Sequence, residues 1–244
     1  MKVTVRGALA AGFILGMCAL CVRLGFWQLD RLQQRREGNA ALASRMRLPP
    51  LTVDAETADS IRRDSAAFVN RRVRASGVYL PGDVVLRGRA HEGRPGVHLV
   101  TPLAVGAGGE VILVNRGWVL SPDAVTVDAA RHAEPGERAV EGILQQVPVT
   151  RDGGAPSSGG GRTTYRRLDL PTLRRTIGRP VLPLYVQQLP EAGPAPPAGL
   201  VRIPLPSPGE GPHLGYAIQW FSFAAIGIVG LAILVFRRRD AAAP

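Results

Sequence analysis

Two long apolar stretches, one near each end of the chain, constrain the fold more than any other feature of the sequence. Residues 216–236 (YAIQWFSFAAIGIVGLAILVF) carry no charge, and residues 7–29 (GALAAGFILGMCALCVRLGFWQL) carry only Arg23. Each stretch is long enough to cross about 30 Å of hydrocarbon as a helix that rises ~1.5 Å per residue. The sequence therefore predicts a membrane protein with a transmembrane helix at each end.

The first stretch has a second interpretation, a cleaved signal peptide, because Lys2 and Arg6 precede it. No A-x-A cleavage site follows the apolar run. Trp27, a residue type typical of membrane interfaces, follows instead, and then Asp30. Arg23 lies near the far edge of the span, where a long side chain can reach water. We favour an uncleaved anchor.

Charges next to the two stretches predict the orientation of the chain. Lys2 and Arg6 precede the first stretch, and three arginines follow the second at 237–239. Positive flanks stay on the cytoplasmic side, so we expect residues 1–6 and the tail 237–244 in the cytoplasm. Residues 30–214 then form an extracytoplasmic domain.

Short segments with β-type residues recur through this central region, separated by glycine- and proline-rich turns. Their spacing predicts a mainly β domain, an antiparallel sheet curled into a small barrel or sandwich. Helix signals are confined to 55–63 and 170–177, and residues 30–47 are a polar, helix-compatible continuation of the first span. We expect a flexible loop at 152–161 and a proline-rich strap at 190–212. The expected strands are 72–79, 83–89, 97–105, 111–119, 139–147, 164–168 and 181–189.

Composition and motifs exclude several classes of function. The net charge of +11 comes from arginines spread along the chain as pairs, which is not the layout of a nucleic-acid-binding stripe. Both cysteines, Cys18 and Cys21, lie in the first apolar stretch, so the domain folds without disulfides and has no thiol redox motif. Neither a catalytic motif nor a nucleophile–base pair is visible, so a membrane-tethered hydrolase finds no support.

His213 is the candidate ligand of the chain. It opens the second apolar stretch, with Tyr216, Ala217 and Trp220 on the same helical face. An imidazole beside an apolar, aromatic wall suits an axial ligand of a porphyrin iron, and Arg23, Arg31 or Arg35 could meet its carboxylates. The alternative is a histidine that caps a helix at the membrane interface, and the residues alone favour it. Trp27-Gln28 and Gln219-Trp220 mark the outer ends of the two spans.

Five segments of the sequence resemble the surfeit locus protein 1 family of cytochrome c oxidase assembly factors, in a bacterial form. The most specific are VNRGWV at 114–119 and HLGYAIQWF at 213–221. The others are LGFWQLDR at 24–31, RRVRASGVYL at 71–80 and GVHLVTPL at 96–103. Together with the two-helix topology, they cover nearly the whole chain.

This resemblance implies a non-enzymatic factor in the bacterial plasma membrane, with a periplasmic central domain. The implied partners are oxidase subunit I and other oxidase assembly factors, besides membrane lipid. The implied cofactor is haem a, with His213 as the expected ligand of the haem iron, which reverses the preference drawn from the residues alone. We expect Trp27, Gln28, Tyr216 and Trp220 to line the site, with Arg23 and Arg31 beside it. An alternative is a scaffold that holds an oxidase intermediate without binding a cofactor.

Arg116-Gly117-Trp118 resembles the family signature within a strand. Glycine inside a strand marks a bulge or a close approach of another backbone. Trp118 is then either an exposed anchor for a partner protein or part of the core. Both interpretations stay open on the sequence alone.

Overall fold

The chain forms two compact units, each described here by itself. The anchor unit comprises Met1–Ala41 and Ser207–Pro244, and the β domain comprises Leu42–Pro206. The computed structural model describes residues 5–106, 109–159, 162–190, 195–205 and 208–240. Predictions that fall on residues 1–4, 160–161, 191–194, 206–207 and 241–244 lie outside the described residues.

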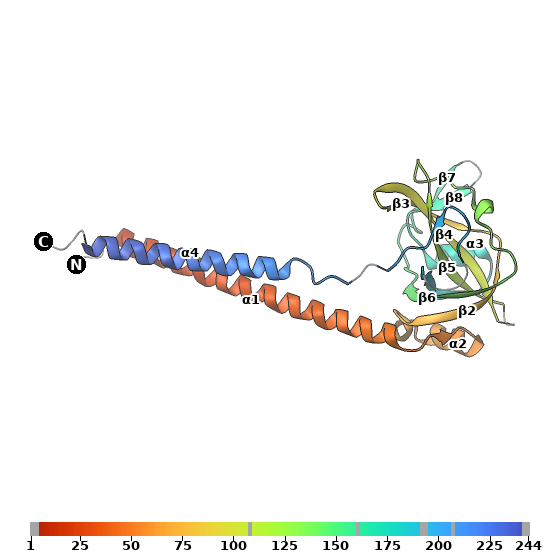
Figure 1. Cartoon of the computed structure of the whole chain (residues 1–244), viewed down its shortest axis with the longest axis horizontal. Helices are drawn as coiled ribbons and strands as arrows, with labels where there is room; N and C mark the ends of the chain where they lie inside the picture. Colours follow the sequence, from red (N-terminus) through yellow and green to blue (C-terminus); the bar gives the residue numbers. More distant parts are fainter. Residues whose placement is uncertain (1–4, 107–108, 160–161, 191–194, 206–207, 241–244) are drawn as a thin grey trace. The chain divides into compact units, whose positions relative to one another are not determined.

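Within its described residues, the β domain holds one ten-stranded sheet, two α-helices and two short 3-10 helices; Figure 1 labels most of the strands. The helices are α2 (Ala55–Arg63), η1 (Ser65–Phe68), η2 (Ala129–His132) and α3 (Leu170–Ile177). The strands are β1 (Leu51–Thr52), β2 (Arg72–Tyr79), β3 (Val84–His91), β4 (Arg94–Val105), β5 (Glu110–Leu120), β6 (Glu137–Gln146), β7 (Ser157–Gly159), β8 (Arg162–Tyr165), β9 (Val181–Gln188) and β10 (Leu200–Val201).

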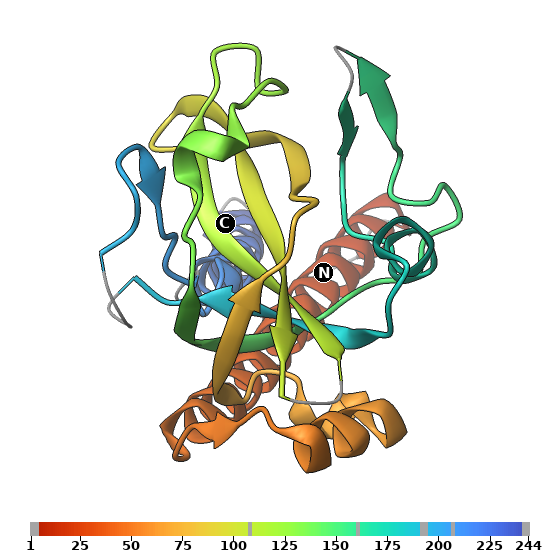
Figure 2. The same ribbon diagram turned by 90° about the vertical axis from the view of Figure 1, so that its right-hand side faces the viewer.

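Five of these strands close into a barrel. They follow the order β2-β6-β9-β5-β4, and β2 pairs with β4 as well as with β6, which completes the ring (Figure 2). The predicted β barrel between two terminal helices is thereby confirmed. The sheet is not purely antiparallel, however, because β1–β2, β3–β8 and β5–β9 are parallel pairs. Each of these pairs is joined by a long connection, as parallel neighbours require.

Strand β5 shows how the sequence pattern fills the core. Its successive side chains alternate between two clusters: Ile112 and Val114 lie among the side chains that α2 also packs against, whereas Val111 and Leu113 lie in the cluster under α3. All four are fully buried or nearly so. A strand buried on both faces reads as a continuous apolar run, which is the pattern of residues 111–114.

Two predictions for irregular segments are wrong in part. The predicted flexible loop 152–161 contains β7, which pairs with β8 and places the Ser158 hydroxyl 3.0 Å from that of Thr163. The predicted strap 190–212 contains β10, which pairs with β5. Neither strand carries the alternating apolar pattern from which strands are recognised, because both are short and lie outside the barrel.

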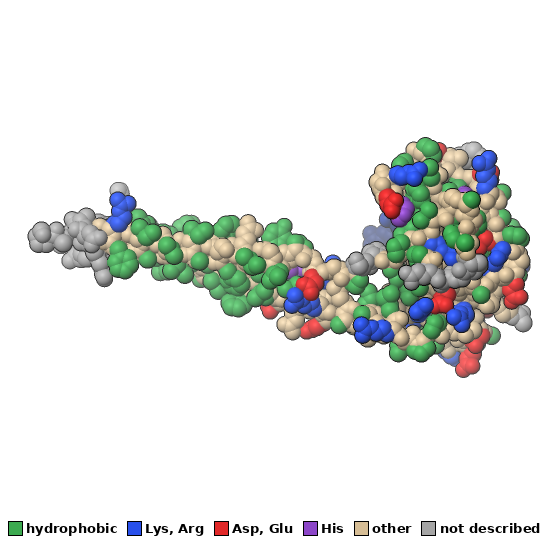
Figure 3. Space-filling model, viewed as in Figure 1, with side chains coloured by type: hydrophobic (Ala, Val, Ile, Leu, Met, Phe, Trp, Pro, Cys, Tyr) green, Lys and Arg blue, Asp and Glu red, His purple; other side chains and the backbone are tan. Residues whose placement is uncertain are grey.

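The anchor unit consists of α1 (Val5–Arg47), up to its boundary at Ala41, and α4 (His213–Asp240). Both helices are long and apolar enough to cross a membrane. Large apolar side chains such as Phe13 and Ile226 are about 70% exposed, at 71% and 68%. Figure 3 shows hydrophobic side chains along the visible face of both helices. Exposed apolar surface of this kind faces lipid, and the protein is membrane-anchored.

Small residues let α1 and α4 pack closely. The Cys18 thiol donates to the Ala224 carbonyl oxygen at 3.5 Å, and a side chain at Gly227 would collide with the Cys18 sulfur. Two helical turns further along α1, a side chain at Gly25 would collide with the Phe221 ring. The cysteines are thus packing residues between two helices, as small residues often are in membranes.

Candidate functional site

His213 lies at the first position of α4 and contacts α1. Its Nδ1 atom is 2.9 Å from Oε1 of Gln28. An amide oxygen can only accept a hydrogen bond, so this contact assigns the proton to Nδ1 and leaves a lone pair on Nε2. Both side chains are half-buried. Gln28 thus occupies Nδ1 of His213 and leaves Nε2, the other potential ligating nitrogen, without a contact to Gln28.

The turn before His213 keeps one side of the imidazole clear. Gly211 has φ +74°, a conformation that favours glycine. A Cβ atom at Gly211 would lie 3.3 Å from Cδ2 and 3.5 Å from Nε2 of His213. Any other residue would therefore crowd the ring edge that carries the lone pair.

Two polar residues of α1 hold this turn in place. Arg36 makes a bidentate ion pair with Glu210, with N–O distances of 2.8 and 2.9 Å. Asn39 donates to the carbonyl oxygens of Pro208 at 3.1 Å and Gly209 at 3.4 Å. We call these contacts the clasp. The clasp fixes the chain immediately before His213. These contacts were not predicted from the sequence.

The two α1 residues of the clasp, Arg36 and Asn39, belong to a stripe of side chains along one side of α1. Gln28, Leu32, Arg36 and Asn39 follow one another at helical spacings of four, four and three, and Leu32 is 5% exposed. Cys18, Cys21 and Gly25 extend the same stripe toward the N-terminus. This seven-residue periodicity is visible in the sequence and could have identified the α4-facing side of α1.

On α4, the predicted face is only partly brought together. Ala217 is buried at 1% exposure, and Trp220 is half-buried against the cluster of Cys18, Cys21 and Ala224. These residues share the α1-facing side with His213. Tyr216, in contrast, is 48% exposed.

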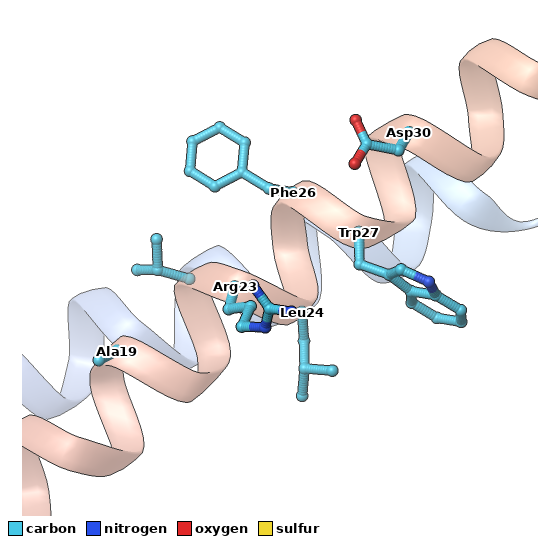
Figure 4. A pocket seen from close by; sticks show the side chains of 7 residues that line it. Ala19, Arg23, Leu24, Phe26, Trp27 and Asp30 are labelled. Carbon is cyan, nitrogen blue, oxygen red and sulfur yellow. The ribbon is translucent and has the colours of Figure 1, made fainter.

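The remaining predicted residues lie elsewhere on α1. Arg23 and Trp27 line an open hollow whose walls are side chains of α1 (Figure 4). Trp27 is 52% exposed, and neither residue makes a hydrogen bond or ion pair within the described part of the chain. Arg31 donates to Gln34 at 2.8 Å. The structure thus joins Gln28 and His213, places Trp220 on the same side of α4, and leaves Arg23, Trp27 and Arg31 without a contact to this pair in the described part of the chain.

The residues around His213 fit an axial ligand of haem iron. Ligating histidines usually donate their second nitrogen to an oxygen acceptor, and the Gln28 amide fills that role here. A porphyrin supplies four ligands of its own, so one imidazole is enough. A bare metal ion needs more, and the described residues contain no group of three or more His, Cys, Asp or Glu side chains that could hold one.

Arg116 is the extra residue of a β-bulge in β5. In the pairing with β4, Leu99 faces Gly117 and Val100 faces Asn115, so Arg116 has no opposite partner. Its side chain is 2% exposed and pairs with Glu134 at 2.8 Å. It also donates to the His132 carbonyl oxygen and to the Thr101 hydroxyl, and its guanidinium lies 5.1 Å from the centre of the Tyr79 ring.

Gly117 and Trp118 are buried with it, so of the two interpretations of Trp118 the structure favours a place in the core over an exposed anchor for a partner protein. Gly117 has φ +140°, and a side chain there would collide with the backbone of Val201 in β10. Trp118 is 4% exposed, covers Gly96 and lies 5.4 Å from the His91 ring. The motif stabilises the domain because its bulge attaches the 132–134 segment and β10 to the barrel.

A second polar group beside the bulge was not anticipated from the sequence. Asn115 donates to Gln187 at 2.8 Å and lies 3.2 Å from Nδ1 of His98. Burial, together with the charges of Arg89 and His91, lowers the pKa of His98 to about 4. His98 is therefore neutral at physiological pH.

Comparisons with known proteins agree with this architecture. Residues 15–225 match the SURF1 family, a span that includes all five segments of the sequence resemblance. A SURF1-like protein of Monosiga brevicollis is 30% identical over 93% of this chain and 86% of its own length. A SURF1-like protein of Rickettsia felis is 26% identical over 91% and 93%. An uncharacterized SURF1-like protein of Mycobacterium bovis is 27% identical over 88% and 80%.

Proposed function

The chain belongs to the SURF1 family, which comprises cytochrome oxidase assembly factors rather than catalytic enzymes, and from this premise we propose that it handles haem a for the oxidase. The client in this proposal is the catalytic subunit of a haem–copper oxidase during its maturation. The hydrogen bond between Gln28 and His213 carries the proposal.

Each part of the site has a distinct task in this proposal. When bound, haem would supply an iron that a histidine nitrogen can ligate. His213 offers Nε2, Gln28 holds the proton on Nδ1, and the missing side chain at Gly211 leaves the ligating edge uncovered. Trp220, half-buried on the same side of α4 as His213 and two helical turns further along, offers apolar surface. A single protein ligand at the half-buried first residue of α4 would suit a cofactor that must later be passed on.

The proposed location is the outer surface of a bacterial plasma membrane, with the β domain in the periplasm. Lys2 and the arginines at 237–239 support this orientation, since they flank the cytoplasmic ends of the two spans. His213 then lies where α4 enters the membrane from outside. The site would be accessible to haem in the outer leaflet.

The test compares haem content across variants of the full-length protein, purified from cells that make haem A. We expect His213→Ala to lose nearly all haem, and Gln28→Ala to lose about tenfold in affinity, a typical effect of removing the partner of a ligating histidine. Gln28→Glu keeps an oxygen acceptor and should retain haem. Gln219→Ala is the matched control, because Gln219 is an exposed amide near the start of α4.

Unchanged haem content in His213→Ala, read from the visible spectrum, would remove His213 from the site. A wild-type protein that is colourless and still co-purifies with oxidase subunit I would favour the scaffold function instead. In that case the amount of subunit I that co-purifies with His213→Ala and with Gln28→Ala should equal the amount that co-purifies with the wild-type protein.

A further inference from the structure

A polar hollow lies in the β domain. It is part of neither the candidate site nor the proposed function. It is bounded by β3, by the residue that follows the neighbouring β8 and by the turn at residues 123–125. Its volume is about 390 Å³. The lining residues are Arg87, Gly88, Arg89, Asp123, Ala124, Val125 and Arg166. We call Arg87, Arg89 and Arg166 the arginine triad.

Backbone carbonyl groups hold two arginines of the triad in fixed positions. Arg87 donates through Nη1 to Thr164 at 2.9 Å and through Nη2 to Ala155 at 2.8 Å. Arg89 donates through Nη2 to the carbonyl oxygen of Arg166 at 2.8 Å. Both side chains are half-buried. These bonds leave further N–H donors on each guanidinium group, already ordered before any ligand arrives.

The turn at residues 123–125, which lines the other side of the hollow, is also held in place. β3 is irregular between Leu86 and Arg89, and Gly88 has φ +68°. The Gly88 N–H donates to the Ala124 carbonyl oxygen at 2.8 Å, which ties the turn to the strand. Asp123 stabilises the turn from within, since its carboxylate accepts from the Ser121 and Thr126 hydroxyls, both at 2.6 Å.

The triad has no counter-ion in the described part of the chain. The one carboxylate in the lining, Asp123, is not within 4.0 Å of any triad nitrogen, and no other described carboxylate is. Burial lowers the pKa of Arg89, and the charge of Arg166 lowers it further, although nearby Tyr185 opposes this. The Nε atom of Arg89 is buried without a hydrogen-bond partner. Arg87 and Arg89 are thus fixed near the exposed Arg166, and a bound anion would stabilise like charges that lie close together.

We propose that the arginine triad binds a phosphate group, carried either by a soluble phosphate ester or by a phospholipid headgroup. Phosphate fits better than carboxylate because its oxygens point in more than one plane and can accept from several guanidinium groups at once. A carboxylate, with two oxygens in one plane, is matched by a single arginine.

The test measures binding of inorganic phosphate to the full-length protein in detergent by calorimetry. Arg166→Gln removes one charge and breaks no side-chain hydrogen bond or ion pair seen among the described residues, since Arg89 uses only the backbone oxygen of Arg166. We expect this variant to bind phosphate about tenfold more weakly, the effect of losing one charge-assisted contact. Arg179→Gln is the matched control, because Arg179 is exposed and lies outside the hollow.

Competition distinguishes the two sources of phosphate. Displacement by phosphatidic acid in mixed micelles at concentrations well below those of glycerol phosphate would assign the headgroup, and the reverse order would assign a soluble ester. The proposal is overturned if the wild-type protein shows no saturable binding of phosphate, or if Arg166→Gln and Arg179→Gln bind phosphate with the same affinity. It is also overturned if acetate competes for the site as strongly as unlabelled phosphate does. Haem content plays no part in this readout, so it is independent of the function proposed for His213.

Discussion

Arg116 in the β domain and His213 in the anchor unit are both polar residues of sequence motifs, but their surroundings satisfy them to different degrees. Arg116 is 1% exposed and has a carboxylate, a carbonyl oxygen, a hydroxyl and an aromatic ring around it. His213 is half-buried, and within the described residues its one hydrogen-bond partner is Gln28, on Nδ1. A fully satisfied group stabilises the fold, whereas a group with a free ligating atom can act on something else.

Two histidines show the same difference. In the β domain, Nδ1 of His98 faces the side-chain amide nitrogen of Asn115 and so accepts a hydrogen bond. In the anchor unit, Nδ1 of His213 faces an amide oxygen and so donates. The neighbouring amide thus decides which ring nitrogen keeps its lone pair.

The largest expected effect is on the Arg116 side of this comparison. Arg116→Ala leaves Glu134 buried without its cation, so the free energy of unfolding of the β domain should fall by about 3–5 kcal/mol. Urea unfolding followed by tryptophan fluorescence measures it. Arg131→Ala is the control, since its ion pair with Asp128 is exposed and should contribute less than about 1 kcal/mol. Equal losses in the two variants would contradict a structural role for the motif.

The second-largest effect is expected on how the stability of the β domain depends on pH. The pKa of His98 is about 4 in the folded state, below the ordinary value of 6.5. The unfolded chain therefore binds a proton between these values that the folded chain does not, and stability falls as pH drops from about 6.5 to about 4. The loss should reach about 3 kcal/mol. His98→Asn should flatten this part of the profile, while His213→Ala should keep it; a profile unchanged by His98→Asn would contradict the assignment.

A smaller effect is expected at the bulge itself. Gly117→Ala should destabilise the β domain by about 1–3 kcal/mol, because it strains φ and pushes β10 away. Gly82→Ala separates the two causes, since Gly82 has φ +103° but nothing within 4 Å of a Cβ atom. Thermal unfolding of both variants measures the difference. If they lose the same stability, the contact with β10 contributes nothing.

The smallest effect is predicted for His213. His213→Ala should leave the free energy of unfolding of the β domain within about 0.5 kcal/mol of wild type, because the residue belongs to the other unit. The same urea titration used for Arg116→Ala measures it. A loss comparable to that of Arg116→Ala would break the distinction between a structural and a functional polar group.

Much of the local structure was predictable from the sequence. Helices α2 and α3 and strand β2 have the predicted bounds, and the other long strands differ by a few residues at their ends. These elements follow from alternation, helix caps and turn residues, which act over a few positions. β7 and β10 were missed because two or three residues carry no periodicity.

The sequence identified residues of the candidate site, but not how these residues are arranged. The sequence singled out Gln28 and His213, but Arg23 and Trp27 were expected beside them and line a separate hollow. The helical phase explains the difference, because Trp27 precedes Gln28 by one residue and therefore points about 100° away around α1. Arg36, Asn39 and Glu210 were missed because polar residues near a membrane surface are common and carry no pattern of their own.

By itself the sequence determined the two membrane spans, the mainly β character of the region between them and the family, since length, alternation and motifs are local properties. Only the tertiary structure decided which strands are parallel neighbours, that the barrel closes through β2 and β4, and that Gln28 meets His213 across a separation of 185 residues. These contacts depend on how distant segments pack together, and short-range patterns do not encode that geometry.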